Sequence, residues 1–191
     1  MSGKKIGGAG LRGQSAGETS ICTVGVSGSG LTYRGFDIVD LAENTTFEEV
    51  AYLLLKGKLP DSQELKAYIE KLKTLRGLQP ELRSTLEGIP KTAHPMDVLR
   101  TGCSVLGNLE QEEGFINQTD HADRMLSAFP SILSYWYQYS HYGKRIDTET
   151  SDDTIGGHFL HLLHGKKPSQ LHDQVMSISL ILYAEHEFNA S

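Results

Sequence analysis

The sequence predicts a mainly α-helical domain with one short β-hairpin near its N-terminus. Three observations support this fold class. Apolar residues recur at helical spacing from Phe36 onward, strand-like runs are confined to residues 20–34, and glycine or proline marks most connections between helical segments. With 191 residues, the chain is long enough to form one domain around a hydrophobic core.

The N-terminal segment divides into an arm and a hairpin. Residues 1–18 are rich in glycine, which supplies no side chain to pack, so we expect a flexible arm. Residues 20–24 and 31–34 are β-prone runs separated by glycines, a pattern that predicts two paired strands.

The first strong helix signal follows this hairpin. Thr46 and Glu49 have the spacing of a capping box, and apolar residues then recur until Gly57, where the helix should end. After the next proline, Asp61 or Ser62 can cap a second amphipathic helix.

The rest of the chain contains further helical segments and two polar connections. The helices are expected at about 81–86, from Pro95 onward, at 122–139, at 154–164 and at 170–184. Pro130 lies inside the longest of these and predicts a kink or local break. Residues 107–118 and 143–153 are polar and are predicted to be surface connections.

Charge and hydropathy exclude several classes of protein. The net charge of -6 argues against a nucleic-acid-binding protein, and no apolar run reaches the ~18 residues of a membrane span. The N-terminus has no apolar stretch of the signal-peptide type. Cys22 and Cys103 are expected to be buried, reduced thiols, so we predict a cytoplasmic protein that contacts neither nucleic acid nor membrane.

Three histidines at spacing three, His158, His161 and His164, suggest a metal site at first inspection. On a helix each lies about 60° from the last, so the outer two diverge by about 120° and cannot easily converge on one ion. We therefore predict packing or hydrogen-bonding histidines and no metal site.

Other candidate motifs are weaker. The glycines between residues 25 and 30 lack the lysine and the helix of a phosphate loop, and no nucleophile elbow is present. The aromatic run at 135–142 is typical of a core or a subunit interface.

The densest polar cluster lies at the C-terminal end of the sequence. His186 stands between Glu185 and Glu187, and Asn189 and Ser191 follow it. On a helix, His186 and Asn189 would face the same side, and a neutral imidazole could donate a hydrogen bond to a ligand carbonyl or carboxylate oxygen. Without further context, a solvated helix end explains the pattern equally well.

Several segments resemble the citrate synthase family, and they occur in the family's order. They are Tyr33-Arg34-Gly35-Phe36-Asp37-Ile38, the helix at 47–54, Gly57-Lys58-Leu59-Pro60, the segment at 94–101 that begins His94-Pro95-Met96, and Ala184-Glu185-His186-Glu187-Phe188-Asn189-Ala190-Ser191. The likeness extends from about residue 20 to 191. It implies that residues 19–191 form the N-terminal portion of the family's large helical domain, and that the chain is truncated before the small domain.

The resemblance also implies an activity. Residues 134–141 and 157–165 are similar to the bacterial family members that condense propionyl-CoA with oxaloacetate and water to give 2-methylcitrate and CoA. His186 matches the family histidine that hydrogen-bonds oxaloacetate, and Asn189 and Ser191 match positions that help to orient ligand and catalytic groups. The family's catalytic histidines and aspartate would follow Ser191, so no catalytic residue is expected within this sequence.

The sequence leaves three functional hypotheses open. The first is the propionyl-CoA enzyme, an acyltransferase of propionate catabolism that forms homodimers and needs no cofactor besides the CoA thioester substrate. The second is a citrate synthase that uses acetyl-CoA. The third is a helical interaction module that keeps the scaffold without catalysis.

Overall fold

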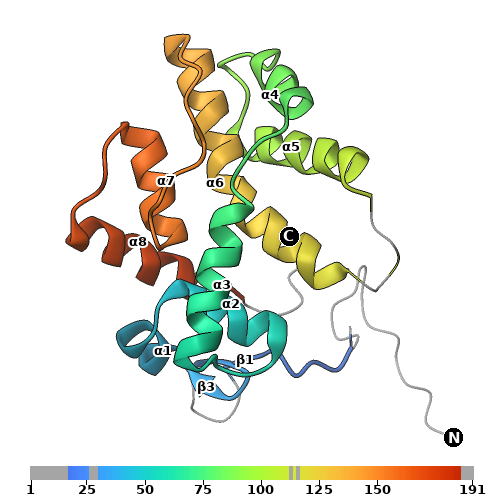
Figure 1. The fold of residues 1–191 in the computed structure, drawn as a ribbon. Coiled ribbons are helices and arrows are strands. Elements are labelled where there is room, and N and C mark those ends of the chain that lie inside the picture. Colours follow the sequence, from blue (N-terminus) through green and yellow to red (C-terminus); the bar gives the residue numbers. More distant parts are fainter. Residues whose placement is uncertain (1–16, 26–29, 112–113, 115–116, 186–191) are drawn as a thin grey trace, which may run out of the picture.

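The computed structural model describes residues 17–25, 30–111, 114 and 117–185. In this part of the chain, eight helices follow a small antiparallel sheet, so the predicted mainly α fold is confirmed (Figure 1). The elements are β1 (Cys22–Val24), β2 (Leu31–Tyr33), β3 (Phe36–Asp37), α1 (Ile38–Asn44), α2 (Phe47–Lys56), α3 (Ser62–Thr74), α4 (Pro80–Glu87), α5 (Pro95–Leu109), α6 (Gln118–Tyr142), α7 (Ile155–His164) and α8 (Gln170–Leu182).

The sheet contains one strand more than the sequence predicted. β1 pairs with β2 as expected, and β2 pairs in turn with β3. The connection between β2 and β3 is a two-residue turn in which Arg34 (φ 49°) and Gly35 (φ 87°) both have positive φ, as in a type I′ turn. β3 is two residues long and leads directly into α1, which is why periodicity alone did not reveal it.

Local capping signals set most helix starts. Thr46 and Glu49 form the predicted capping box of α2, and Gly57 ends that helix in the left-handed conformation (φ 87°). Of the two candidate caps for α3, Asp61 is the N-cap and Ser62 is the first helical residue.

The longest helix, α6, runs without interruption from Gln118 to Tyr142, although Pro130 lies inside it. Of the two predicted effects of Pro130, the local break is therefore absent and the kink is present. Figure 1 shows the two halves of α6 running in different directions, as expected where proline removes a backbone donor and crowds the preceding turn.

The polar segment at 143–153 differs from its predicted role as a simple surface connection. Thr148 and Asp152 within it are buried. Ser131 in α6 donates a hydrogen bond to the Thr148 carbonyl at 3.5 Å, so this segment packs back onto the helix that precedes it. Such a contact links residues 17 positions apart and has no signature in local sequence.

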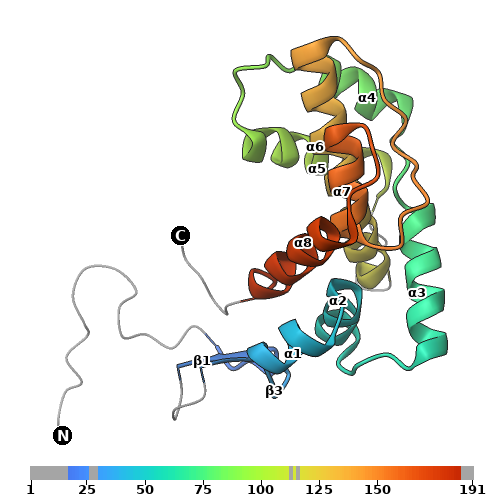
Figure 2. The ribbon, with the colours of Figure 1, turned by 90° about the vertical axis from the view of Figure 1, so that its left-hand side faces the viewer.

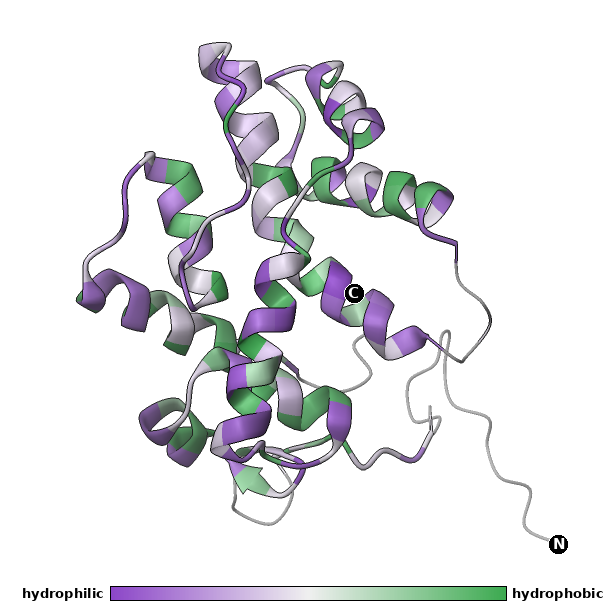
Figure 3. Ribbon diagram, viewed as in Figure 1, coloured by the Kyte–Doolittle hydropathy of each residue, from purple (hydrophilic) through white to green (hydrophobic). Residues whose placement is uncertain are grey.

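The helices carry both hydrophobic and hydrophilic residues along their length (Figure 3). The buried apolar residues form two clusters. The lower cluster gathers the sheet, α1, α2 and α3 with one residue each from α7 and α8: Cys22, Tyr33, Leu41, Phe47, Val50, Ala51, Leu53, Tyr68, Leu72, Ile155 and Ile181. The upper cluster gathers α4, α5 and α6 with one residue of the connection between α3 and α4: Leu78, Leu82, Leu86, Val98, Leu106, Ala128, Ile132, Tyr135 and Trp136.

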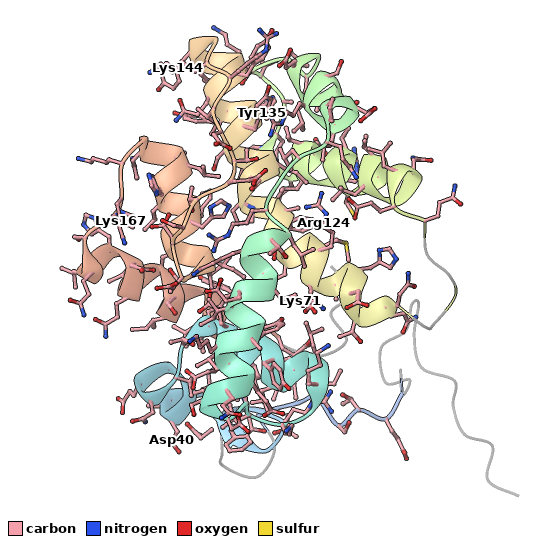
Figure 4. All side chains as sticks on the ribbon, in the orientation of Figure 1. Asp40, Lys71, Arg124, Tyr135, Lys144 and Lys167 are labelled. Carbon is pink, nitrogen blue, oxygen red and sulfur yellow. The ribbon has the colours of Figure 1, made fainter. Side chains whose placement is uncertain are left out.

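Polar contacts join α3 to α6 beside the lower cluster. The buried Asp123 carboxylate accepts hydrogen bonds from the Tyr68 hydroxyl at 2.8 Å and from Lys71 Nζ at 2.6 Å; Lys71 is labelled in Figure 4. Neither cysteine forms a disulfide; Cys22 is buried as predicted, whereas Cys103 is only half-buried, so the prediction of two buried thiols was wrong for Cys103. Among the described helices, none is long and apolar enough to cross a membrane.

Candidate functional site

The residues that the sequence singled out, His186, Asn189 and Ser191, lie outside the described residues. The structure does describe the helix that precedes them in the sequence, α8. Helix α8 ends at Leu182, and the described chain continues to Glu185, the residue directly before His186. The elements that hold this helix end are therefore the described part of the candidate site.

Helix α8 is fixed to its neighbours along its length. Ser169 caps its N-terminus by accepting a hydrogen bond from the His172 amide at 3.3 Å. Near its middle, Ser177 Oγ accepts a hydrogen bond from the Phe47 amide at the start of α2, at 3.1 Å. Figure 2 shows α8 running from α7 toward the layer formed by α1 and β1. The helix thus connects the histidine helix to the small sheet.

A buried tyrosine of the sheet holds the C-terminal end of α8. The Tyr33 hydroxyl donates to the Ile181 carbonyl at 2.9 Å and accepts from the Glu185 amide at 3.3 Å. Burial raises the pKa of Tyr33, so the phenol stays protonated at neutral pH and keeps its donor. We call this pair of hydrogen bonds the Tyr33 bridge.

The histidine row does not assemble into one site. His158 is fully buried, with Nε2 3.1 Å from Ser131 Oγ and Nδ1 2.9 Å from Thr150 Oγ1. The Nδ1 atom of His161 lies 2.6 Å from the buried Asp152 carboxylate, whereas His164 is exposed. The hydrogen-bonding interpretation is confirmed for His158 and His161. Within the described residues, no group of three His, Cys, Asp or Glu side chains could hold a metal ion.

His158 belongs to a buried polar layer that joins the connection after α3 to α6, α7 and the 143–153 segment. We call this set, Arg76, Ser131, Thr150 and His158, the polar layer. Arg76 is 1% exposed and donates to the Thr150 carbonyl at 2.8 Å and to the Thr154 carbonyl at 3.4 Å. Burial, followed by the nearby Arg76 guanidinium, lowers the pKa of His158 to about 3. A neutral imidazole with both nitrogens engaged cannot exchange protons with a substrate, so this histidine is structural.

A buried carboxylate, that of Glu48, stabilises the start of α7. Glu48 is 1% exposed, and its Oε1 accepts a hydrogen bond from the Ile155 amide at 2.7 Å. Burial raises the pKa of this carboxyl. An acceptor at a helix N-terminus satisfies an amide that has no partner within the helix. Glu48 was not recognised in the sequence because its partner lies 107 residues away.

His94, before α5, and the aromatic run at 135–142 also have mainly structural roles. His94 is the N-cap of α5, and its Nδ1 accepts a hydrogen bond from the Met96 amide at 3.2 Å. Tyr135, labelled in Figure 4, and Trp136 are buried in the upper cluster, whereas Tyr142 is 59% exposed. The core assignment is confirmed for the first part of the run.

An apolar cavity of about 260 Å³ lies among five helices. Its lining comes from α2, α5, α6, α7, α8 and includes Phe47, Leu99, Phe129, Phe159 and Met176. Among the described residues, none that lines this cavity has a charged or hydrogen-bonding side chain, so the described lining offers nothing to orient a dicarboxylate such as oxaloacetate. The candidate ligand site therefore remains at the end of α8.

Comparison with known proteins gives this architecture a family. The profile described as "Citrate synthase, C-terminal domain" matches residues 10–191. A 2-methylcitrate synthase of Shewanella oneidensis is 70% identical over 98% of this chain. The chain covers 50% of that relative, and it spans about half the length of the other curated relatives it matches.

Solved structures agree with this assignment. A citrate synthase from Thermotoga maritima superposes with a TM-score of 0.80 at 33% identity, covering 95% of this chain and 48% of that one. A citrate synthase from Thermoplasma acidophilum, in ternary complex with carboxymethyl coenzyme A and oxaloacetate, gives a TM-score of 0.86 at 23% identity over 94% of this chain and 48% of that one, and so shows the shared fold. The chain belongs to the citrate synthase family.

Proposed function

We propose that the protein carrying this sequence is a 2-methylcitrate synthase. It would condense propionyl-CoA with oxaloacetate and water, releasing 2-methylcitrate and CoA, and would need no cofactor besides the thioester substrate. The carrying observation is the 70% identity to the Shewanella enzyme of that name, which extends over 98% of this chain. The 2-methylcitrate synthase 1 of Corynebacterium glutamicum, at 35% identity, gives further support.

Residues 19–191 would then be the N-terminal portion of the large helical domain, and His186 would hydrogen-bond oxaloacetate. Asn189 and Ser191 would help to orient the ligand. The position of His186 directly after the Tyr33 bridge supports this assignment, because the bridge fixes the backbone that precedes it. We further propose a cytoplasmic homodimer; the exposed apolar side chains of Met96 on α5 and of Leu171 and Val175 on α8, each more than half exposed, support burial of part of this surface in an assembly.

A citrate synthase that uses acetyl-CoA is the second candidate. A citrate synthase of Acidithiobacillus ferridurans is 34% identical, and a Bacillus subtilis relative, 31% identical, is named for both activities. Turnover of propionyl-CoA and of acetyl-CoA with oxaloacetate by the full-length protein separates the two. A wide preference for acetyl-CoA would favour the second candidate, and turnover of neither thioester would favour a non-catalytic helical module.

Substitution of the candidate ligand residue tests the site itself. His186→Ala should raise the KM for oxaloacetate by roughly tenfold to a hundredfold, because it removes a hydrogen bond to a charged ligand. The control is His172→Ala, which changes an exposed side chain on α8 and should leave the KM unchanged. Equal kinetics for His186→Ala and the unsubstituted enzyme would refute the assignment of His186.

A further inference from the structure

Three side chains that can each bind a soft metal ion line one small cavity between α5 and α6. They are Cys103 on α5, and His121 and Met125 on α6. The cavity has a volume of about 80 Å³ and is also lined by Arg124, which is labelled in Figure 4. This is well below the roughly 300 Å³ of an ordinary small-molecule pocket, so the cavity has room for an ion or a few waters but for no metabolite.

The two sulfur atoms of this set are in contact. Cys103 Sγ lies 3.5 Å from Met125 Sδ, so the thiol of one helix meets the thioether of the other. An ion at a metal–sulfur distance of about 2.3 Å from both would form an S–metal–S angle of roughly 100°, close to the tetrahedral value. Both sulfurs can therefore bind one ion without movement of either helix.

His121 supplies a third donor. Met125 follows it by four residues, so the two side chains lie on the same face of α6. Its Nε2 atom is buried and has no hydrogen-bond partner among the described residues. Buried polar atoms are normally satisfied, and an orphan calls for a bound ion or water. A buried water needs two to four polar partners, and sulfur is a poor one, so an ion that binds both sulfur and nitrogen fits this lining better.

The charge and softness of the donors select the ion. Glu110 and Arg124, the other polar side chains of the lining, pair with each other at 3.0 Å and add no net charge. A thiolate at the half-buried Cys103 carries one negative charge, which a monovalent cation neutralises and Zn²⁺ would exceed. Thiolate and thioether ligands favour copper(I), and imidazole also binds copper.

We infer that Cys103, His121 and Met125 form a binding site for one copper(I) ion. Binding converts the Cys103 thiol to a thiolate and releases one proton to solvent, with no change in the oxidation state of copper or sulfur. The set differs from the histidine row because its donors come from two facing helices and include a methionine. The site is independent of the proposed synthase activity.

Competition with a chromogenic copper(I) chelator tests the site in the full-length protein, without oxygen and with reduced thiols. The unsubstituted protein should retain one more equivalent of copper(I) than Cys103→Ser. Met125→Leu, which keeps the side-chain volume, and His121→Gln should each weaken retention by at least about tenfold, since a metal ligand is lost. The matched controls, Met96→Leu and His172→Gln, change exposed side chains on α5 and α8 and should retain copper as the unsubstituted protein does.

X-ray absorption of the copper-loaded protein identifies the donors directly. We expect two sulfurs and one nitrogen around the copper in the unsubstituted protein, and one sulfur fewer in Met125→Leu. This spectrum decides the site even where a variant fails to fold, because copper bound by fewer than two sulfurs in the unsubstituted protein would overturn it.

The retention data can also contradict the inference. Equal retention by Cys103→Ser and the unsubstituted protein would overturn the site. Loss in Cys103→Ser alone, with Met125→Leu and His121→Gln unchanged, would show adventitious binding by one thiol only. Retention of zinc in place of copper(I), when both are supplied, would overturn the choice of ion.

Discussion

At the scale of single residues, burial determines the protonation state of His158. The imidazole lies fully buried in the polar layer, and its pKa is lowered to about 3. An unfolded chain would titrate near the ordinary value of about 6.5, so between these two values the unfolded state binds more protons than the folded state. Stability from this group is therefore present at neutral pH and is lost as the pH falls below the unfolded pKa.

The loss should amount to about 1.4 kcal/mol for each pH unit below about 6.5. His158→Asn should be less stable at neutral pH, because the asparagine cannot span the distance to both hydroxyls, and its stability should fall less steeply with acidification. Urea unfolding between about pH 7 and about pH 5 measures both slopes. His164→Asn, an exposed change on the same helix, is the control; parallel slopes for His158→Asn and the unsubstituted chain would contradict the assignment.

At the scale of elements, the packing of α5 on α6 depends on one glycine. A Cβ atom built at Gly102 would lie 2.7 Å from Ile132 Cγ2 and 3.0 Å from its Cδ1. Ile132 is fully buried and β-branched, so it cannot rotate away without disturbing the upper cluster. The close approach of these two helices therefore requires the absence of a side chain at residue 102.

Gly102→Ala should destabilise the protein by about 1–3 kcal/mol, since overpacking outweighs the gain in helix propensity. Gly107→Ala on the same helix, where nothing lies within 4 Å of the added atom, should instead stabilise it by up to about 1 kcal/mol. Chemical denaturation of the two variants gives the comparison. A stabilised Gly102→Ala protein would show that α5 can move away from α6.

At the scale of the whole molecule, two apolar clusters are joined by the polar layer. Arg76 follows α3 in the chain, and its hydrogen bonds to the carbonyls of Thr150 and Thr154 connect the lower elements to the segment that returns from α6. Burial lowers the pKa of this guanidinium, a sign that the charge has lost most of its water. We expect the layer to couple the unfolding of the two clusters.

Arg76→Met should cost about 1–3 kcal/mol, because the two carbonyls lose their donor while buried. It should also separate the unfolding transitions. Trp136, the single tryptophan, reports the upper cluster by fluorescence, whereas circular dichroism reports all helices. The two midpoints should coincide in the unsubstituted chain and in the surface control Arg100→Met, and differ in Arg76→Met. Coincident midpoints in Arg76→Met would refute the coupling.

Short sequence patterns predicted the helix starts and ends that interactions within one helical turn determine. The capping box of Thr46 and Glu49, the proline at the start of α5 and the glycine after α2 each act within one helical turn, so each was visible. The burial of Thr148 and Asp152 was missed because their partners lie on α6 and α7. The strand β3 was missed because two residues are too few to show an alternating hydrophobic pattern.

The candidate site was predictable only in part. His186, Asn189 and Ser191 were found through resemblance to a family, since their local pattern fits a solvated helix end equally well. Their assigned roles stay predictions, because these residues lie outside the described structure. The contact of Tyr33 with the end of α8 gave no signal either: a tyrosine in a β-prone run is ordinary, and its partners lie 148 and 152 positions away in the chain.

That separation has a consequence for how the molecule is made. The hairpin leaves the ribosome early, yet the hydroxyl of Tyr33 can find Ile181 only after 148 further residues have been synthesised. Contacts of such high contact order close late, because the loop entropy must be overcome before they form. The hairpin and the end of α8 would thus join late in the folding of this region, and weakening their contact would speed unfolding more than it slows folding.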